Sequence, residues 1–183
     1  MVVFRNAVDT DARAIANLHA LSWQKHYRQS FSAHFLDVEV FDERIRVWQK
    51  RFQNPKNTQH ILLAVEKDRL LGFICSYFDE HPVYGTYLDN LHVNSQEKGK
   101  GIGTQLMCKL AEEILIGKYS HGFYLWVLTT NKPAISFYER LGGKAMDTVK
   151  ADDIGDTIFY KTRYVWSNMQ DFLNLARSKT TTN

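Results

Sequence analysis

A glycine-rich turn at residues 98–104 (KGKGIGT) combines residue types that can bind an anion. Alternate glycines let backbone N–H groups approach a ligand closely, because no Cβ atom stands in the way. Leu106, Leu110 and Ile114 follow at helical spacing, so the turn leads into a helix whose first N–H groups are unpaired and carry a partial positive charge. Two lysines add full charges, and phosphate is the expected ligand. The residues expected to bind it are Lys98, Gly99, Lys100, Gly101, Ile102, Gly103 and Thr104.

The glycine spacing fits neither of two well-known nucleotide-binding motifs. A P-loop needs Gly, four residues and then Gly-Lys-Ser/Thr, and neither Gly99-Lys100 nor Gly143-Lys144 fits this pattern. A dinucleotide fingerprint needs G-x-G-x-x-G, but in a motif that starts at Gly99 the third glycine, Gly103, comes one place too early. The turn therefore predicts a phosphate site of another kind.

The same turn resembles the Gln/Arg-x-x-Gly-x-Gly/Ala signature of the GCN5-related N-acetyltransferase (GNAT) superfamily. The match starts at Lys98, which stands where the family usually has Gln or Arg and keeps the positive charge. A second register starting at Gln96 is also present, although the start of the helix favours the first. The resemblance implies that the turn binds the pyrophosphate of acetyl-coenzyme A, which would be the co-substrate.

A second motif lies at residues 129–143. Asn131 as a helix cap, Pro133 in the first turn and Gly142 just past the end predict a short helix. The segment resembles the family's Asn-x-x-Ala-x-x-Phe-Tyr-x-x-x-Gly-Phe pattern, with Gly143 in place of the final aromatic residue. This match implies that Asn131 hydrogen-bonds the pantetheine or the strand beside it, and that the Tyr138 hydroxyl points at the sulfur of coenzyme A. Tyr138 as a plain core aromatic is the alternative.

Acetyl transfer from a thioester to an amine makes two demands that nearby residues can meet. Negative charge develops on the carbonyl oxygen, and backbone N–H groups at the end of the strand at 87–93 can stabilise it, as an oxyanion hole does. The leaving thiolate has a conjugate-acid pKa near ~8.5, so a tyrosine hydroxyl with a pKa near ~10 can protonate it. The residues expected in these roles are Leu91, His92 and Val93 for the oxygen, and Tyr138 as the general acid.

The amine itself must lose a proton, because an alkyl amine is mostly protonated at neutral pH. A base or a chain of water molecules must accept it. The family resemblance implies a Glu at the position held here by Tyr87. Asp89 shares a strand face with Tyr87 under strict alternation and is the next candidate base, whereas His92 would lie on the opposite face. The candidate catalytic residues are therefore Tyr87, Asp89 and Tyr138, with an ordinary solvated carboxylate as the alternative for Asp89.

Aromatic residues in the first two helices are candidates for the acceptor pocket. Trp48 and Phe52 complete a helical apolar stripe, which favours the core for both. Asp79, Glu80 and Asp89 near an aromatic-rich entrance would suit a cationic amine, such as a polyamine, an aminoglycoside or a lysine side chain. The residues expected to bind the acceptor are Trp23, Tyr27 and Tyr87.

Composition narrows the class of protein. A chain of 183 residues fits one domain, and a net charge of +3 from scattered basic residues does not indicate nucleic-acid binding. Cys75 and Cys108 lie far apart in apolar segments, which favours reduced thiols over a disulfide. Apolar runs fall short of the ~20 residues of a membrane span, and the N-terminus lacks a signal pattern, so we expect a cytoplasmic protein. The histidine and cysteine spacings predict no metal site.

The predicted elements follow the order β-α-α-β-β-β-α-β-α-β-β over residues 1–166. This order matches the fold of the GNAT superfamily. The resemblance implies an α+β fold, an α/β/α sandwich around a mixed, mostly antiparallel central sheet with acyl-CoA N-acyltransferase topology. Residues 167–183 are expected to form a C-terminal tail, partly disordered from about residue 178. Homodimers are frequent in the family, and the apolar last strand and tail offer an interface.

The motifs together predict an N-acetyltransferase that moves the acetyl group of acetyl-CoA directly to a primary amine of a small molecule or peptide. A non-catalytic acyl-CoA-binding regulatory module is the alternative from another class. A third possibility is O-acyl transfer to a hydroxyl group.

Overall fold

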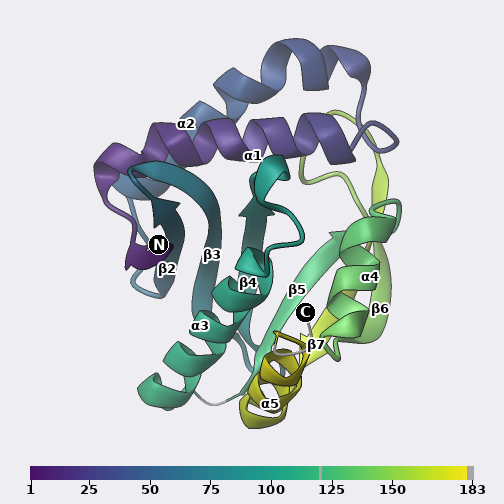
Figure 1. Ribbon diagram of the computed structural model, residues 1–183. Helices are drawn as coiled ribbons and strands as arrows, with labels where there is room; N and C mark the ends of the chain where they lie inside the picture. The colour runs from purple at the N-terminus through teal and green to yellow at the C-terminus, as the bar shows by residue number, and fades with distance from the viewer. Residues whose placement is uncertain (120, 181–183) are drawn as a thin grey trace.

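The computed structural model describes residues 1–119 and 121–180 (Figure 1). None of the helices formed by these residues is long and apolar enough to cross a bilayer. The strands are β1 (Val3–Asn6), β2 (Gln59–Glu66), β3 (Arg69–His81), β4 (Gly85–Val93), β5 (Phe123–Leu128), β6 (Lys144–Ala151) and β7 (Phe159–Trp166). The α-helices are α1 (Ala12–His26), α2 (Val40–Gln53), α3 (Ile102–Gly117), α4 (Lys132–Arg140) and α5 (Met169–Thr180), with short helical segments η1 (Asp9–Asp11), η2 (Phe35–Glu39) and η3 (Ser95–Glu97).

The strands form one mixed sheet in the order β1-β2-β3-β4-β5-β7-β6. Every neighbouring pair is antiparallel except β4 and β5, which are parallel. Helices α1 and α2 cover one face of the sheet, and α3 and α5 lie on the other, next to α4 (Figure 1). The expected α/β/α sandwich with a mostly antiparallel sheet is confirmed.

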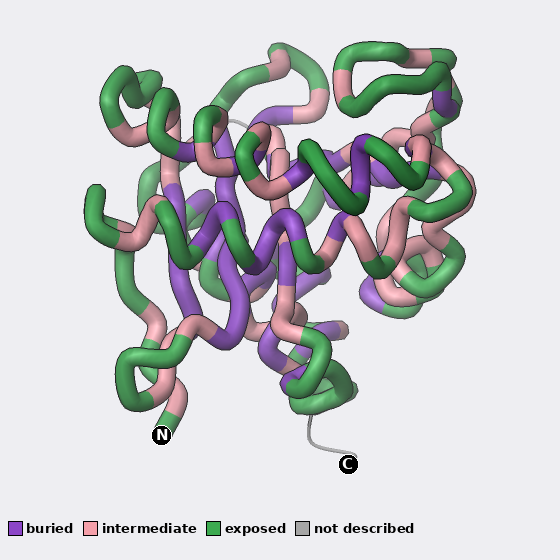
Figure 2. Tube along the Cα trace, turned by 90° about the horizontal axis from the view of Figure 1, so that it is seen from above, coloured by how far each residue is buried: buried purple, intermediate pink, exposed green. Residues whose placement is uncertain are grey.

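Two hydrophobic clusters explain why the layers hold together. On one face, Leu106, Leu110 and Ile114 of α3 pack against β2, β3 and β4, as their helical spacing predicts. On the other face, Ile15 and Trp48 bring α1 and α2 onto the same strands. Figure 2 shows the buried residues running along the central strands and along the inner faces of the helices. The core assignment of Trp48 is confirmed.

Strands β4 and β5 separate soon after they meet. They pair only at Thr86 with Phe123 and at Tyr87 with Tyr124, although β4 continues to Val93 and β5 to Leu128. Beyond Tyr87, the edge of β4 that faces β5 is not paired by that strand. Backbone N–H and C=O groups need hydrogen-bond partners, so the opening between the two strands is suited to a ligand with amide groups.

A β-bulge lies in the same part of β4. Ser76 pairs with Leu88, but the preceding residue of β3, Cys75, pairs with Asn90, so Asp89 is an extra residue. A bulge of this kind shifts the alternation of side chains by one position. The residues after Asp89 therefore point to the opposite faces from those that strict alternation predicts.

Helix α5 is the largest departure from the sequence expectation. Residues 167–183 were expected to form a partly disordered tail, but residues 169–180 form a helix that packs against α3 and the sheet. The rings of Phe123 and Trp166 receive Phe172 edge-on, at centroid distances of 5.4 and 6.3 Å. Residues 181–183 lie outside the described part of the chain. We infer that the domain continues to the end of α5.

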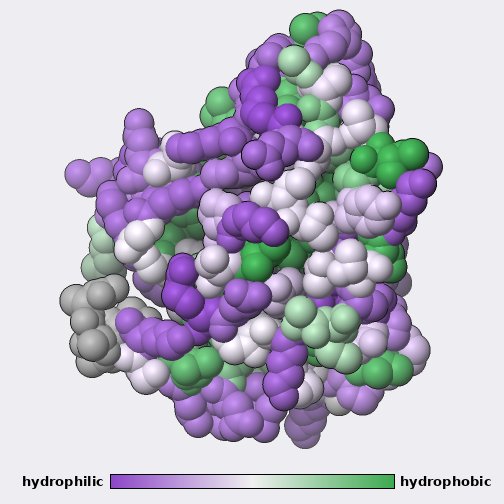
Figure 3. Space-filling model, turned by 90° about the vertical axis from the view of Figure 1, so that its right-hand side faces the viewer, coloured by the Kyte–Doolittle hydropathy of each residue, from purple (hydrophilic) through white to green (hydrophobic). Residues whose placement is uncertain are grey.

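The side of the molecule formed by β6 and α4 is mainly hydrophilic, with hydrophobic side chains in separate groups (Figure 3). Met146, Ile158 and Tyr160, on or beside the last two strands, are exposed. The homodimer expected through this part of the chain stays a prediction.

Helix α5 should contribute strongly to stability. Replacing Phe172 with Ala should lower the free energy of unfolding by about 3–5 kcal/mol, because a buried ring is lost and a cavity is left. Denaturant unfolding would measure the change. The exposed Asn174→Ala on the same helix is the control, with an expected change within about 0.5 kcal/mol. Equal effects of the two substitutions would show that α5 is not part of the core.

Candidate active site

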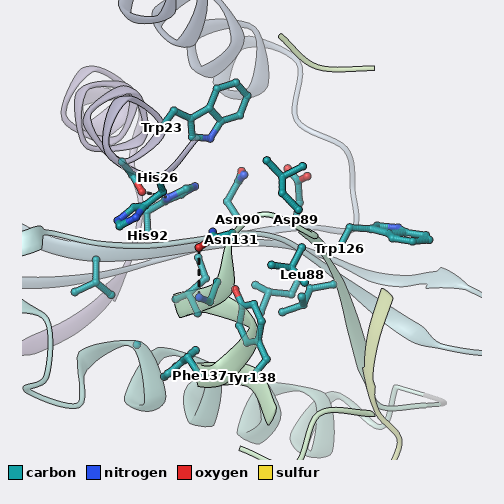
Figure 4. Close-up of a pocket in the computed structure, with 18 of the residues that line it drawn as sticks. Trp23, His26, Leu88, Asp89, Asn90, His92, Trp126, Asn131, Phe137 and Tyr138 are labelled. Carbon is teal, nitrogen blue, oxygen red and sulfur yellow. Dashed lines mark hydrogen bonds between the residues drawn. The ribbon is translucent and has the colours of Figure 1, made fainter. Parts of the chain in front are cut away.

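A cavity of about 1230 Å³ opens where β4 and β5 part (Figure 4). It is lined by α1 and α2 on one side of the sheet, by α4 on the other, and by the turn at residues 98–104 and the loop after β6. The elements that form it are far apart in the sequence. All the residues expected to bind the cofactor or the acceptor, and all three candidate catalytic residues, line this cavity.

The glycine turn has a backbone conformation that is unfavourable for residues other than glycine. Gly99 and Gly101 have φ angles of +82° and +77°, in the left-handed region. No side chain caps α3, and its first backbone bond runs from the Gln105 N–H to the Gly101 oxygen at 2.9 Å. The N–H groups of residues 102–104 therefore precede the first bond of the helix and lie at its positive end. A Cβ atom on Gly99 would meet nothing within 4 Å, so there is space beside the turn for an anion.

The two lysines of the turn have different surroundings. Lys98 Nζ lies 2.6 Å from His26 Nε2 at the end of α1, and burial lowers the pKa of Lys98. Lys100 pairs with the buried carboxylate of Glu97 at 2.9 Å, and Arg69 also pairs with Glu97 at 2.9 Å. Lys100 thus stabilises the turn through Glu97, while Lys98 faces a neutral or weakly basic ring.

Tyr138 approaches the opening from α4. Its side chain is 8% exposed, its ring packs against Trp166 and Tyr164, and its hydroxyl points into the cavity (Figure 4). Burial raises the pKa of Tyr138, so the phenol stays protonated at neutral pH. Asn131 caps α4 as expected, because its Oδ1 accepts a hydrogen bond from Ala134 N at 3.3 Å.

Asp89 reaches the cavity but is not a free carboxylate. Its Oδ2 lies 2.7 Å from Arg51 Nη2 of α2, and Arg51 Nη1 also donates to Asn90 Oδ1 at 2.8 Å. Burial raises the pKa of Tyr87, and the nearby charge of Asp89 raises it further. The Asp89 carboxylate is therefore one half of an ion pair and not a free group in the cavity wall.

His92 corrects the expectation from strict alternation. The bulge at Asp89 turns His92 toward α1, so it lies on the same face as Tyr87 and Asp89 rather than on the opposite one (Figure 4). Its Nδ1 is 2.9 Å from Ser22 Oγ, and its ring lies 4.3 Å from that of His19. Burial, and next the charge of Arg44, lower the pKa of His92 to about 3. The side chains of Leu91 and Val93 pack toward the α3 face.

Two of the three aromatic residues expected at the acceptor site, Trp23 and Tyr27, belong partly to the core. Trp23 is 4% exposed and packs in a third cluster with Phe31 and Leu128, yet it also lines the cavity. Burial raises the pKa of Tyr27 to about 12. Tyr27, at the end of α1, and Asn131, at the start of α4, both line the opening.

The acidic residues of the cavity differ from those expected. Asp79 and Glu80 are not among its lining residues, and Glu80 pairs with Lys56 at 2.7 Å. Sequence reasoning missed the side chains that α2 and the loop after β6 bring into the cavity, because only tertiary packing places them there. These residues are Glu43, Arg44, Val47, Arg51, Asp152 and Asp153.

Comparison with known proteins supports one family. The sequence matches the acetyltransferase (GNAT) family over residues 16–143. Mouse thialysine N-epsilon-acetyltransferase is 40% identical over 81 residues, which cover 41% of this chain and 45% of the mouse protein. The chain thus matches about half the length of that relative. The uncharacterized N-acetyltransferase YuaI of Bacillus subtilis (strain 168) is 28% identical over 145 residues, or 76% of this chain and 78% of YuaI.

Solved structures show the same fold. PaiA N-acetyltransferase of Thermoplasma acidophilum, in complex with coenzyme A, has a TM-score of 0.66 and 19% identity, with 91% of this chain and 99% of that chain covered. Arabidopsis thaliana NAA60, in complex with a bisubstrate analogue, has a TM-score of 0.68 and 17% identity, with 91% and 98% covered. Because the family match includes the parted strands, the glycine turn and helix α4, the chain belongs to the acetyltransferase (GNAT) family.

Proposed function

We propose that this protein transfers the acetyl group of acetyl-CoA directly to a primary amine of a small molecule or peptide. One observation carries the proposal. The opening between β4 and β5 has an uncapped helix N-terminus on one side and the buried hydroxyl of Tyr138 on the other. In acetyl-CoA, the diphosphate could bind at the helix N-terminus while the thioester lies near the Tyr138 hydroxyl.

The turn is the proposed site for the diphosphate. The N–H groups of residues 102–104 and the positive φ angles of Gly99 and Gly101 present main-chain donors to an anion. Lys98 adds a positive charge, and Asn131 lies further along the opening. We assign the backbone of Leu91–Val93 to the carbonyl oxygen, since this part of β4 follows the point where β5 departs.

Tyr138 is the proposed general acid. Acetyl-CoA supplies an acyl group on a thiol leaving group, and the departing thiolate needs a proton. The Tyr138 phenol keeps its proton, because burial holds its pKa above the usual ~10, and it can donate a hydrogen bond throughout the neutral range.

The proton of the amine is proposed to leave through water rather than to a side chain. Three carboxylates on the acceptor side of the cavity are paired with cations, Glu43 with Arg44, Asp89 with Arg51, and Asp153 with Lys161. We therefore assign Asp89 and Tyr87 to orienting the amine, with Trp23 and Tyr27 as cavity walls. The name of the mouse relative supports an acceptor that carries an amine on its side chain.

Tyr138→Phe tests the general acid. The substitution should lower kcat by about 10²-fold, because the leaving thiolate loses its proton donor, while coenzyme A affinity stays within about threefold. Thiol release with a panel of amines would measure kcat, and calorimetry the affinity. Tyr164→Phe is the matched control, since this phenol bonds Glu139 and does not line the cavity. An unchanged kcat in Tyr138→Phe would remove Tyr138 from the mechanism.

Gly101→Glu tests the anion site. A side chain at this positive φ strains the turn, and a carboxylate repels the diphosphate, so calorimetry should detect no coenzyme A binding. Gly142→Ala is the control. Gly142 also has a positive φ but lies outside the cavity, so this substitution should lower stability and leave coenzyme A affinity unchanged. Normal binding by Gly101→Glu would refute the assignment.

The pH dependence tests the absence of a side-chain base. With water as proton acceptor, kcat/KM should rise about tenfold per pH unit toward the pKa of the amine, near ~10.4 for an alkyl amine. No fall from Tyr138 is expected as pH rises through ~10, because its pKa is raised. Asp89→Asn should keep the same slope. A plateau below pH ~8 that Asp89→Asn abolishes would identify Asp89 as the base.

The same assays separate the alternatives from other classes. Coenzyme A binding without thiol release from any acceptor would indicate a binding module. A hydroxylamine-labile product would indicate O-acyl transfer.

A further inference from the structure

We propose that Arg44 binds a carboxylate on the acceptor, so that the acceptor is a free amino acid whose side-chain amine receives the acetyl group. This inference rests on the proposed acetyltransferase function and names the substrate class. It starts from a buried guanidinium in the cavity wall that the proposed transfer chemistry does not use.

Arg44 lies inside the acceptor side of the cavity. Its side chain is only 7% exposed, and the guanidinium carbon lies 4.2 Å from the centre of the Trp23 ring. Packing on this ring holds the planar group in one orientation. Its charge acts on β4, because it lowers the pKa of His92 on that strand, although burial lowers this pKa more. Arg44 is therefore close to the strand where the thioester carbonyl is proposed to lie.

The partner of Arg44 is a neighbour in sequence. Arg44 Nε and Nη2 bond the carboxylate of Glu43, whose side chain is 29% exposed. Side chains at positions i and i+1 of a helix diverge, so Glu43 must fold back over α2 to reach the guanidinium. Arg44 Nη1 forms no hydrogen bond with the described residues. A ligand carboxylate entering the cavity can take the place of Glu43, which then turns out to solvent.

Two other cationic side chains on this side of the cavity already form ion pairs within the protein. Arg51 is held by Asp89 and Asn90, and Lys161 by Asp153 at 2.8 Å. Arginine presents a planar fork of N–H donors that matches a carboxylate with two parallel hydrogen bonds. Arg44 is thus the group with the geometry and the exchangeable partner needed for an anion.

The charge of Arg44 selects among amines. A diamine has no anion to offer the guanidinium, and a lysine within a peptide has its carboxylate tied up in an amide bond. A free amino acid has both a carboxylate and an α-ammonium. Asp152, in the loop after β6, also lines the cavity, and no ion pair is recorded for it among residues 1–119 and 121–180. In this proposal Asp152 binds the ammonium, which leaves the side-chain amine for the reaction.

Acceptors that differ only at the carboxylate test the inference. Thiol release is measured with lysine and with thialysine. Each free amino acid is compared with its carboxamide and with the diamine that lacks the carboxylate. The wild type should show a kcat/KM for the free amino acid about 10- to 100-fold above that for the carboxamide and the diamine, the usual value of a charge-assisted pair. Arg44→Gln should remove this preference, so that kcat/KM for the free amino acid no longer exceeds that for the carboxamide.

A second variant guards against misfolding of Arg44→Gln. Glu43→Gln changes a partly exposed residue and frees the guanidinium, so KM for the free amino acid should fall relative to KM for the diamine. Calorimetry should show unchanged coenzyme A binding in both variants. Wild-type preference for the diamine or carboxamide, or an equal loss with every acceptor in Arg44→Gln, would overturn the inference. Turnover of none of the amines by the wild type would instead overturn the proposed function, and the inference with it.

Discussion

The parting of β4 from β5 is the constraint on which the rest of the site depends. Within a sheet, each strand satisfies the hydrogen-bonding groups of its neighbours, and a strand edge left open inside a protein must find other partners. Here the two strands pair at only two positions before they diverge. The loss of pairing creates the cavity, exposes the end of β4 and lets Tyr27, at the end of α1, and Asn131, at the start of α4, line the same opening.

Two ion pairs inside this cavity join residues of different elements. Arg51 of α2 holds Asp89 of β4, and Lys161 of β7 holds Asp153 of the adjacent loop. Pairing avoids the large cost of a lone buried charge. Tyr138 remains a neutral donor for a similar reason, because burial disfavours its charged form.

Features that depend on the spacing of a few neighbouring residues could be predicted from the sequence alone. The glycine turn, the apolar stripe of α3 and the cap at Asn131 depend on local spacing, and each appears in the fold as expected. The order of strands and helices followed from the same local patterns. The short amphipathic patch after residue 169 was visible too, but its helix forms against Phe123 and Trp166, which come from distant strands.

The amino-acid sequence by itself determined the glycine turn, the tyrosine-bearing helix and the family to which they point, since backbone conformation in turns and caps is a local property. Tertiary structure alone decided which side chains share the cavity. The bulge at Asp89 reversed the facing of His92, and packing of α2 over the sheet brought Arg51 to Asp89 and Arg44 onto Trp23. These contacts join residues far apart in the chain, and their register depends on how whole elements pack, which no short window of sequence contains.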